Sequence, residues 1–172
     1  IRVLEVLRST RDFETHLIIS HTAKRIIEYE TKFKVRDVEL LSDIVHDVDD
    51  LFSPLSSGSF ITSGMIVAPC SIKTLSSIAN SFSHNLITRA ADVCLKEGRK
   101  VVLLVRESPL HIGHIRLMLK VAEAGAIVMP PIPAFYSHPE KVDDIVNHTV
   151  GKVLDQFGIH TEIYRRWKGA ME

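Results

Sequence analysis

The stretch MIVAPCSIKTL, residues 65–75, couples a short apolar run to a segment with helical spacing. Residues 65–68 are apolar without alternation, which is typical of a strand buried on both faces of a parallel sheet. Ser71 and Thr74 stand where a helix would begin directly after that strand. A strand that leads straight into a helix is the repeating unit of parallel α/β folds.

Three further apolar runs of this kind lie at residues 16–20, 101–105 and 126–129. Segments with helical period lie between and after the four runs, at residues 22–30, 72–79, 86–96, 111–124 and 142–157. This alternation predicts a doubly wound parallel sheet of the flavodoxin-like or Rossmann-like α/β class. The length is that of one domain, so residues 1–172 are expected to form a single α/β domain.

The chain opens with IRVLEVLR, residues 1–8, whose apolar residues are spaced as in a helix. No Ser, Thr, Asp or Asn precedes this helix as an N-cap. We therefore expect the first strand of the sheet to precede Ile1 in the complete protein. Charged residues recur every few positions, which is not the pattern of a signal peptide.

The composition argues against two classes of protein. Lys and Arg total 21, and so do Asp and Glu, so the formal net charge is +0 and nucleic-acid binding is not expected. No apolar run approaches the roughly 20 residues that a membrane helix needs. Cys70 and Cys94 lie in segments expected to be buried, which favours a reducing compartment, and we expect the cytoplasm.

Ligands of doubly wound sheets bind beyond the carboxyl ends of the strands, so the residues after each apolar run are candidate site residues. These residues are the segments 20–22, 69–74, 106–109 and 130–136. Ser71 and Thr74 could offer a helix N-terminus to a phosphate, or could simply cap the helix. Arg106 and Glu107 could clamp a phosphate and exchange a proton, or could form a salt bridge at the sheet edge.

Two groups of charged residues have structural interpretations that compete with functional ones. Arg89, Asp92 and Lys96 share one helix face and are interpreted as a ladder of ion pairs. The acidic run DVDD, residues 47–50, resembles the Mg²⁺ motif of diphosphate-using prenyl enzymes. The residues that flank this run differ from those of the Mg²⁺ motif, and the sequence has no second acidic run to complete a metal site. A solvated turn or cap is therefore favoured.

Three further side chains could carry chemistry only with partners that the sequence does not supply. His111 and His114 have a spacing that can hold a metal, but no third ligand joins them, so we expect a packed or solvent-facing pair. Cys70 lacks an activating base nearby and is interpreted as a packing residue or a neighbour of a flavin. No metal site is predicted.

Several long and unusual strings of this chain are similar to those of one enzyme family. They are SGS (57–59), MIVAPCSIKTL (65–75), LITRAADV (86–93), LKE (95–97), VRESPL (105–110) and MPPIPAFY (129–136). With these strings the chain resembles the UbiX flavin prenyltransferase family from Ile1 to Trp167. The resemblance implies a metal-independent enzyme that joins the dimethylallyl group of dimethylallyl phosphate to N5 and C6 of reduced FMN.

The resemblance also implies roles for individual residues and for partners. Contacts to FMN are implied for Ser20, Ser71, Ile72, Lys73, Thr74 and Arg106. Tyr136 and Lys152 would hold the phosphate of the prenyl donor. Catalytic roles around the reacting groups are implied for Glu30, Arg89, Lys96, Arg106 and Glu107. The product would serve a UbiD-type decarboxylase, for example in ubiquinone synthesis, and the enzyme would be a large homo-oligomer, such as a dodecamer, with sites between subunits.

One part of the family pattern is not found in residues 1–172. The family begins with a strand and a glycine-rich turn, Gly-x-x-Gly-Ala-Ser/Thr-Gly-Ala, which wraps the FMN phosphate and supplies a catalytic serine. We expect both to precede Ile1.

Two rival interpretations compete with prenyl transfer. The first is a flavin-dependent peptidyl- or phosphopantothenoyl-cysteine decarboxylase. Such enzymes carry the motif Pro-Ala-Ser-Ala-Asn-Thr at the place where this chain has PCSIKT, residues 69–74. Their Met-Asn-Xaa-Xaa-Met-Trp substrate clamp is also missing from this chain. The second is a non-catalytic FMN-binding subunit. Retention of Arg106, Glu107, Tyr136 and Lys152 argues against it, since FMN binding alone would not require them all.

Overall fold

The computed structural model describes residues 1–10, 12–167 and 169. Its helices are α1 (Arg2–Thr10), α2 (His21–Glu30), α3 (Val35–Glu39), α4 (Ile72–Ala79), α5 (Leu86–Lys96), α6 (Ile112–Glu123) and α7 (Val142–Asp155), with 3-10 turns η1 (Pro54–Ser56) and η2 (Phe135–Ser137). Its strands are β1 (His16–Ile18), β2 (Ile44–His46), β3 (Gly64–Cys70), β4 (Lys100–Val105) and β5 (Ile127–Val128).

All described strand pairs are parallel, as the sequence predicts. β1 pairs with β2, and β3, β4 and β5 pair in that order in a second sheet, where Gly64 lies opposite Lys100. The register of β3 and β4 shifts between Val67 and Cys70. Pro69 lies in this interval, and a proline has no N–H to donate to a neighbouring strand.

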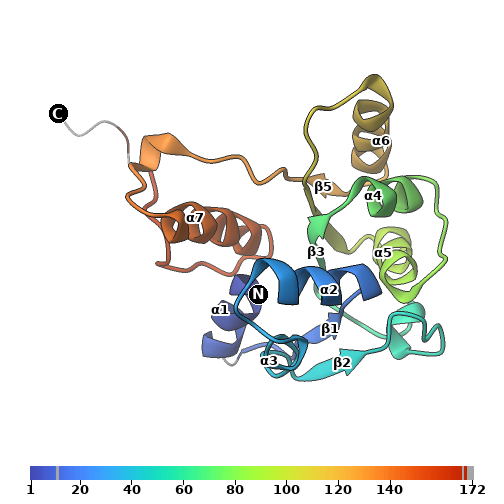
Figure 1. Cartoon of the computed structure of the whole chain (residues 1–172). Coiled ribbons are helices and arrows are strands. Elements are labelled where there is room, and N and C mark those ends of the chain that lie inside the picture. The colour runs from blue at the N-terminus through green and yellow to red at the C-terminus, as the bar shows by residue number, and fades with distance from the viewer. Residues whose placement is uncertain (11, 168, 170–172) are drawn as a thin grey trace.

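Helices cover both faces of the β3–β4–β5 sheet, which is the doubly wound arrangement (Figure 1). Figure 1 shows α4, α5 and α6 grouped on one side of β3, with α7 on the other. Successive residues of β4 therefore enter different cores: Leu103 packs with the α4–α6 side, whereas Val102 and Leu104 pack with Val153 of α7. Burial on both faces explains why this strand reads as a continuous apolar run.

Sequence patterns predicted the long elements and the short strands β1 and β5, but missed β2 and α3. The predicted helices 72–79 and 86–96 coincide with α4 and α5, and the helix at the start of the chain is α1. β2 and α3 were not predicted, because three residues beside aspartates and a five-residue helix carry too little periodicity. In the part of the chain that the structure describes, no helix has the length and apolar character to cross a membrane.

Candidate active site

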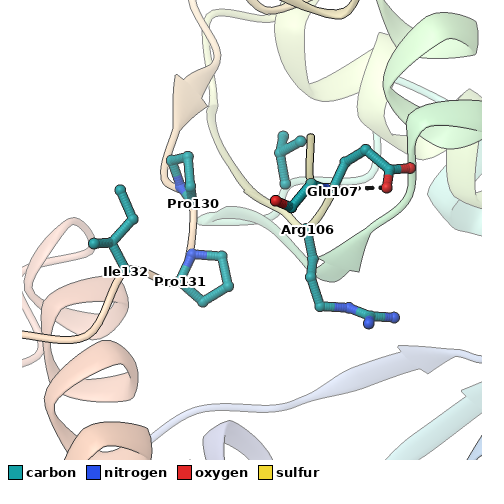
Figure 2. A pocket seen from close by; sticks show the side chains of 7 residues that line it. Arg106, Glu107, Pro130, Pro131 and Ile132 are labelled. Atoms are coloured by element: carbon teal, nitrogen blue, oxygen red, sulfur yellow. Dashed lines mark hydrogen bonds between the residues drawn. The ribbon is translucent and has the colours of Figure 1, made fainter. Parts of the chain in front are cut away.

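A pocket of about 370 Å³ opens at the carboxyl end of β4 (Figure 2). Arg106, Glu107 and Ser108 line it on one side, and the segment 130–132 that follows β5 lines it on the other. In Figure 2 the side chains of Arg106 and Glu107 extend in different directions, and Pro131 faces them across the pocket. This is the edge at which ligands of parallel sheets bind.

Arg106 is exposed, and among the described residues no carboxylate forms an ion pair with it. The alternative of a salt bridge at the sheet edge is therefore not observed. Glu107 instead uses its Oε1 to accept a hydrogen bond of 3.1 Å from the N–H of Ser108. The guanidinium is thus available to an anion, and a carboxyl group lies at the adjacent position.

The first turn of α4 lies at the same edge of the sheet. The N–H of Arg106 donates to the carbonyl of Cys70 at 3.2 Å, which ties the end of β4 to the residue before Ser71. Ser71 caps the helix, since its Oγ accepts from the N–H of Thr74 at 3.3 Å. Within the described residues the N–H groups of Ile72 and Lys73 have no acceptor, so they remain available to a ligand.

Arg89 and Lys96 both lie on α5, but only Arg89 forms part of the predicted ladder. Arg89 Nη1 pairs with Asp92 at 3.4 Å, and Arg89 Nε donates to the carbonyl of Ser56 at 3.0 Å. Lys96 pairs with Glu97 rather than with Asp92, so the ladder prediction is wrong for Lys96. The hydrogen bond from Lys96 is the main cause of the lowered pKa of Glu97.

The string 57–59 packs against side chains at the C-terminal end of α5. A Cβ at Gly58 would overlap the side-chain ends of Lys96 and Glu97. Arg99, which the sequence analysis missed, donates to the carbonyls of Gly58 at 2.6 Å and of Phe60 at 2.7 Å. Its position two residues after the string LKE does not indicate these contacts, because the acceptors are backbone carbonyls distant in sequence.

Ser20 and Glu30 stand at opposite ends of α2 and are not brought together. Ser20 caps the helix by accepting from the N–H of Ala23 at 3.1 Å, and Glu30 is exposed at the last position. The helix has 10 residues, so its ends are separated by roughly 15 Å at about 1.5 Å per residue. The two side chains cannot act on the same atom from one α2 helix.

Tyr136 and Lys152 each lie close to His148, although η2 and α7 are separate elements. The chain runs extended from β5 toward α7 and carries Tyr136 in η2 (Figure 1). The Tyr136 hydroxyl lies 3.0 Å from Nε2 of His148, and Lys152 follows one helical turn later. Burial, and then the charge of Lys152, lower the pKa of His148. His148 therefore links two residues that the family pattern assigns to the phosphate of the donor.

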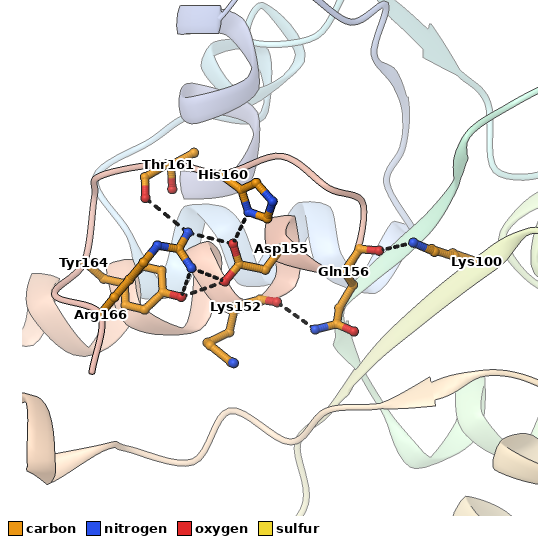
Figure 3. Close-up of polar contacts among 8 residues, drawn as sticks. All are labelled: Lys100, Lys152, Asp155, Gln156, His160, Thr161, Tyr164 and Arg166. Carbon is orange, nitrogen blue, oxygen red and sulfur yellow. Dashed lines mark hydrogen bonds and ion pairs between the residues drawn. The ribbon is translucent and has the colours of Figure 1, made fainter. Parts of the chain in front are cut away.

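A polar network fixes the segment that follows α7 (Figure 3). Both Asp155 carboxylate oxygens accept from Arg166, at 2.7 and 2.9 Å, and Tyr164 donates to the same carboxylate at 2.6 Å. The hydrogen bond from Arg166 is the main cause of the strongly lowered pKa of Asp155. Burial, followed by the bond to Asp155, raises the pKa of Tyr164 to about 12. The Tyr164 ring thereby packs edge-on against His148, with centroids 5.1 Å apart.

The remaining candidates have the structural roles that the sequence favoured. Asp47 and Asp50 accept from backbone N–H groups two residues later, at 2.9 Å each, as turn residues do. The rings of His111 and His114 pack together, with centroids 3.6 Å apart. Cys70 is fully buried, which raises the pKa of its thiol to about 12.

The candidate residues therefore form separate groups within one chain. The strand-edge group comprises Arg106, Glu107 and the segment 71–74, and a second group comprises Tyr136 and Lys152 around His148. Arg89 and Lys96 belong to α5 and its contacts with the η1 loop, and the ends of α2 stand apart. The sequence predicted the members of each group but not this separation.

Comparison with known proteins identifies the class. The flavoprotein family matches residues 1–154, so the chain is a flavoprotein in fold and sequence. The chain is 53% identical over 172 residues to the flavin prenyltransferase UbiX of Escherichia coli K12, covering 99% of this chain and 91% of that protein. The chain belongs to the UbiX family of flavin prenyltransferases.

Solved structures agree with this assignment. The crystal structure of AnUbiX in complex with FMN and dimethylallyl pyrophosphate has a TM-score of 0.96 and 46% identity, covering 99% of this chain and 90% of that chain. A dodecameric FMN-dependent UbiX-like decarboxylase from Escherichia coli O157:H7 has a TM-score of 0.96 and 51% identity, covering 98% and 91%. The peptidyl-cysteine decarboxylase EpiD reaches 0.57 at 20% identity, with 77% and 73% covered, and shares the fold alone.

Proposed function

We propose that this protein transfers a dimethylallyl group from dimethylallyl phosphate to N5 and C6 of reduced FMN. The observation that carries the proposal is the pocket at the end of β4, beside the open first turn of α4. There Arg106, which pairs with no carboxylate among the described residues, lies next to the carboxyl of Glu107. Family membership at 53% identity supplies the chemistry expected there.

The donor set at this edge fits FMN. FMN carries negative charge and many hydrogen-bond acceptors, and Ser71, the N–H groups of Ile72 and Lys73, the Thr74 hydroxyl and Arg106 offer donors. Ser20 is assigned to FMN on the family pattern. When bound, reduced FMN supplies the nucleophilic nitrogen and carbon to which the prenyl group is joined. The protein orients that surface and keeps water from it.

Loss of the phosphate is the step that the protein must assist most. Cleavage of the allylic C–O bond leaves negative charge on the phosphate, and Tyr136 and Lys152 are assigned to stabilise it. Arg89, Lys96 and Arg106 add positive charge around the reacting groups. Glu107 or Glu30 would accept and relay the protons that ring closure releases, since a carboxylate can act as a general base.

The protein is also proposed to be a homo-oligomer whose sites lie between subunits. The separation of the candidate groups within one chain supports this, because residues from several copies would have to meet. Large apolar side chains are exposed, with Phe52 at 100%, Tyr29 at 90% and Ile61 at 84%. Such side chains mark protein–protein contacts where they gather in one patch. The UbiX-like structure of Escherichia coli O157:H7 is described as dodecameric.

Two further proposals concern where the product goes and where the enzyme works. A UbiD-type decarboxylase would use the prenylated flavin. The reaction mixture, added to such a decarboxylase that lacks its cofactor, should restore decarboxylation. A control mixture incubated without the prenyl donor should not. The cytoplasm is proposed as the compartment because Cys70 and Cys94 are buried free thiols.

The test of the activity is a donor-dependent change in the flavin. The protein is incubated anaerobically with chemically reduced FMN and dimethylallyl phosphate, and the released flavin is examined by mass spectrometry. A flavin heavier by one five-carbon prenyl unit is expected. Parallel reactions with dimethylallyl pyrophosphate and with no donor identify the substrate. An unchanged flavin with both donors would refute the proposed function.

A further inference from the structure

His148 is a buried polar residue to which neither the family pattern nor the sequence analysis gives a role. It is 9% exposed and lies in the middle of α7, in contact with the rings of Tyr136 and Tyr164. Both aromatic rings meet the imidazole edge-on, at interplanar angles of 83° and 78°. These two ring contacts limit the orientations that the imidazole, and so Nε2, can adopt.

The Tyr136 hydroxyl lies 3.0 Å from this fixed nitrogen although the Tyr136 side chain is 53% exposed. An exposed tyrosine in a 3-10 turn would otherwise rotate among several orientations, and holding it in one costs conformational entropy. The contact with His148 limits that freedom from a rigid helix. Lys152 lies one turn further along the same helix, so α7 carries one partner of the donor phosphate and holds the other, Tyr136, through His148.

The direction of the hydrogen bond decides what Tyr136 can do. A hydroxyl that donates to Nε2 turns its lone pairs outward, and lone pairs repel an anionic phosphate. A hydroxyl that accepts from an Nε2–H keeps its own proton for the phosphate oxygen. Burial and the charge of Lys152 lower the pKa of His148, so the imidazole is neutral and the position of its single ring proton sets this direction.

We propose that His148 is a positioning residue that donates its Nε2–H to the Tyr136 hydroxyl and thereby aims the hydroxyl proton at the phosphate of the prenyl donor. This inference rests on the proposed function, because it assigns Tyr136 to that phosphate. His148 itself touches neither donor nor flavin. Its entire effect on the reaction passes through Tyr136.

A double-mutant cycle tests this statement. His148→Leu, Tyr136→Phe and the double variant are compared with the wild type for KM of dimethylallyl phosphate, kcat and FMN affinity. His148→Leu should raise KM or lower kcat/KM roughly three- to tenfold, the worth of one hydrogen bond, with FMN affinity unchanged. In the Tyr136→Phe background the same substitution should have almost no further effect.

Further variants separate positioning from a general loss of structure. The amide nitrogen of His148→Gln can take the place of Nε2, so this variant should keep kcat/KM within about twofold, whereas the shorter His148→Asn should lose as much as His148→Leu. His84→Leu replaces an exposed imidazole whose described contacts, with Phe82 and Asn85, lie outside this network, and it should leave the kinetics unchanged. If His148→Leu does not fold, His148→Asn takes its place in the cycle.

Each outcome decides a different statement. If His148→Leu lowers kcat/KM equally in the presence and absence of the Tyr136 hydroxyl, the residue acts by another route and the inference is wrong. The inference also fails if His148→Gln loses as much as His148→Asn. If the wild type forms no prenylated flavin, the proposed function itself fails, which is a separate result.

Discussion

Gly151→Ala should destabilise the protein, although the same change in an ordinary helix interior stabilises it. Gly151 is a buried residue of α7, and a Cβ there would overlap the Cδ1 and Cε1 atoms of the Tyr164 ring and lie 3.3 Å from its Cγ. The ring must move for alanine to fit. It is held by the hydroxyl bond to Asp155 and by its edge contact with His148.

The competing contributions have known sizes. Alanine gains about 1 kcal/mol over glycine in a helix interior. Displacing the ring forfeits a hydrogen bond worth about 1 kcal/mol and an aromatic contact worth about 1 kcal/mol, with overpacking strain of about 1–3 kcal/mol. The net expectation is a loss of about 2–4 kcal/mol in the free energy of unfolding. Because Tyr164 packs against His148, the KM for dimethylallyl phosphate should also rise.

Urea unfolding at neutral pH measures this prediction, and a Tyr164→Ala background provides the matched control. Without the ring, Gly151→Ala should become stabilising by about 1 kcal/mol, the helix propensity alone. If Gly151→Ala stabilises the wild-type protein by that amount, the ring does not occupy the space beside Gly151, and the packing of the C-terminal segment described above is wrong.

Three other predictions have defined outcomes. Lys152→Ala and Tyr136→Phe should each weaken the use of dimethylallyl phosphate by about 1.5–3 kcal/mol, roughly tenfold to hundredfold, in steady-state kinetics. FMN affinity, measured by flavin fluorescence, should hardly change, and loss of FMN instead would contradict the assignment. The stability gap between the wild type and Asp155→Asn should be largest above about pH 5 and should shrink as pH falls below about 4. The sign follows because the bond from Arg166, which only the folded protein has, lowers the pKa of Asp155. Protonation of Asp155 in acid removes the stability that this bond contributes. A gap that widens in acid would contradict this. The Cys70 thiol, whose pKa is raised to about 12 by burial, should resist alkylation at about pH 8.5 in the native protein and react after denaturation, and rapid native labelling would overturn its role as a packing residue.

The sequence predicted the strand-edge part of the site because local patterns determine it. An apolar run buried on both faces marks β4, and the next residue, Arg106, must then stand at the carboxyl edge. Ser71 was expected to begin a helix for the same reason, and it caps α4. These placements need only the order of residues along the chain and the rule that parallel strands end at one edge.

Contacts between distant segments could not be predicted. Nothing near Arg99 indicates that its guanidinium binds the carbonyls of Gly58 and Phe60. The pairing of Tyr136 with His148 requires α7 to lie beside the segment that follows β5. The position of α7 is set by its packing on β4 and α1, which the local sequence does not indicate. The ladder prediction for Lys96 is wrong because Lys96 pairs with the adjacent Glu97 and not with Asp92, four positions earlier.

A structure of the protein with FMN and dimethylallyl phosphate bound tests the central claim most directly. We predict a flavin that contacts the first turn of α4 and Arg106, with the donor phosphate within hydrogen-bonding distance of the Tyr136 hydroxyl and the Lys152 ammonium, supplied by the same or a neighbouring subunit. A flavin bound away from the carboxyl edge of β3 and β4, or a donor phosphate that touches neither Tyr136 nor Lys152, would contradict the account.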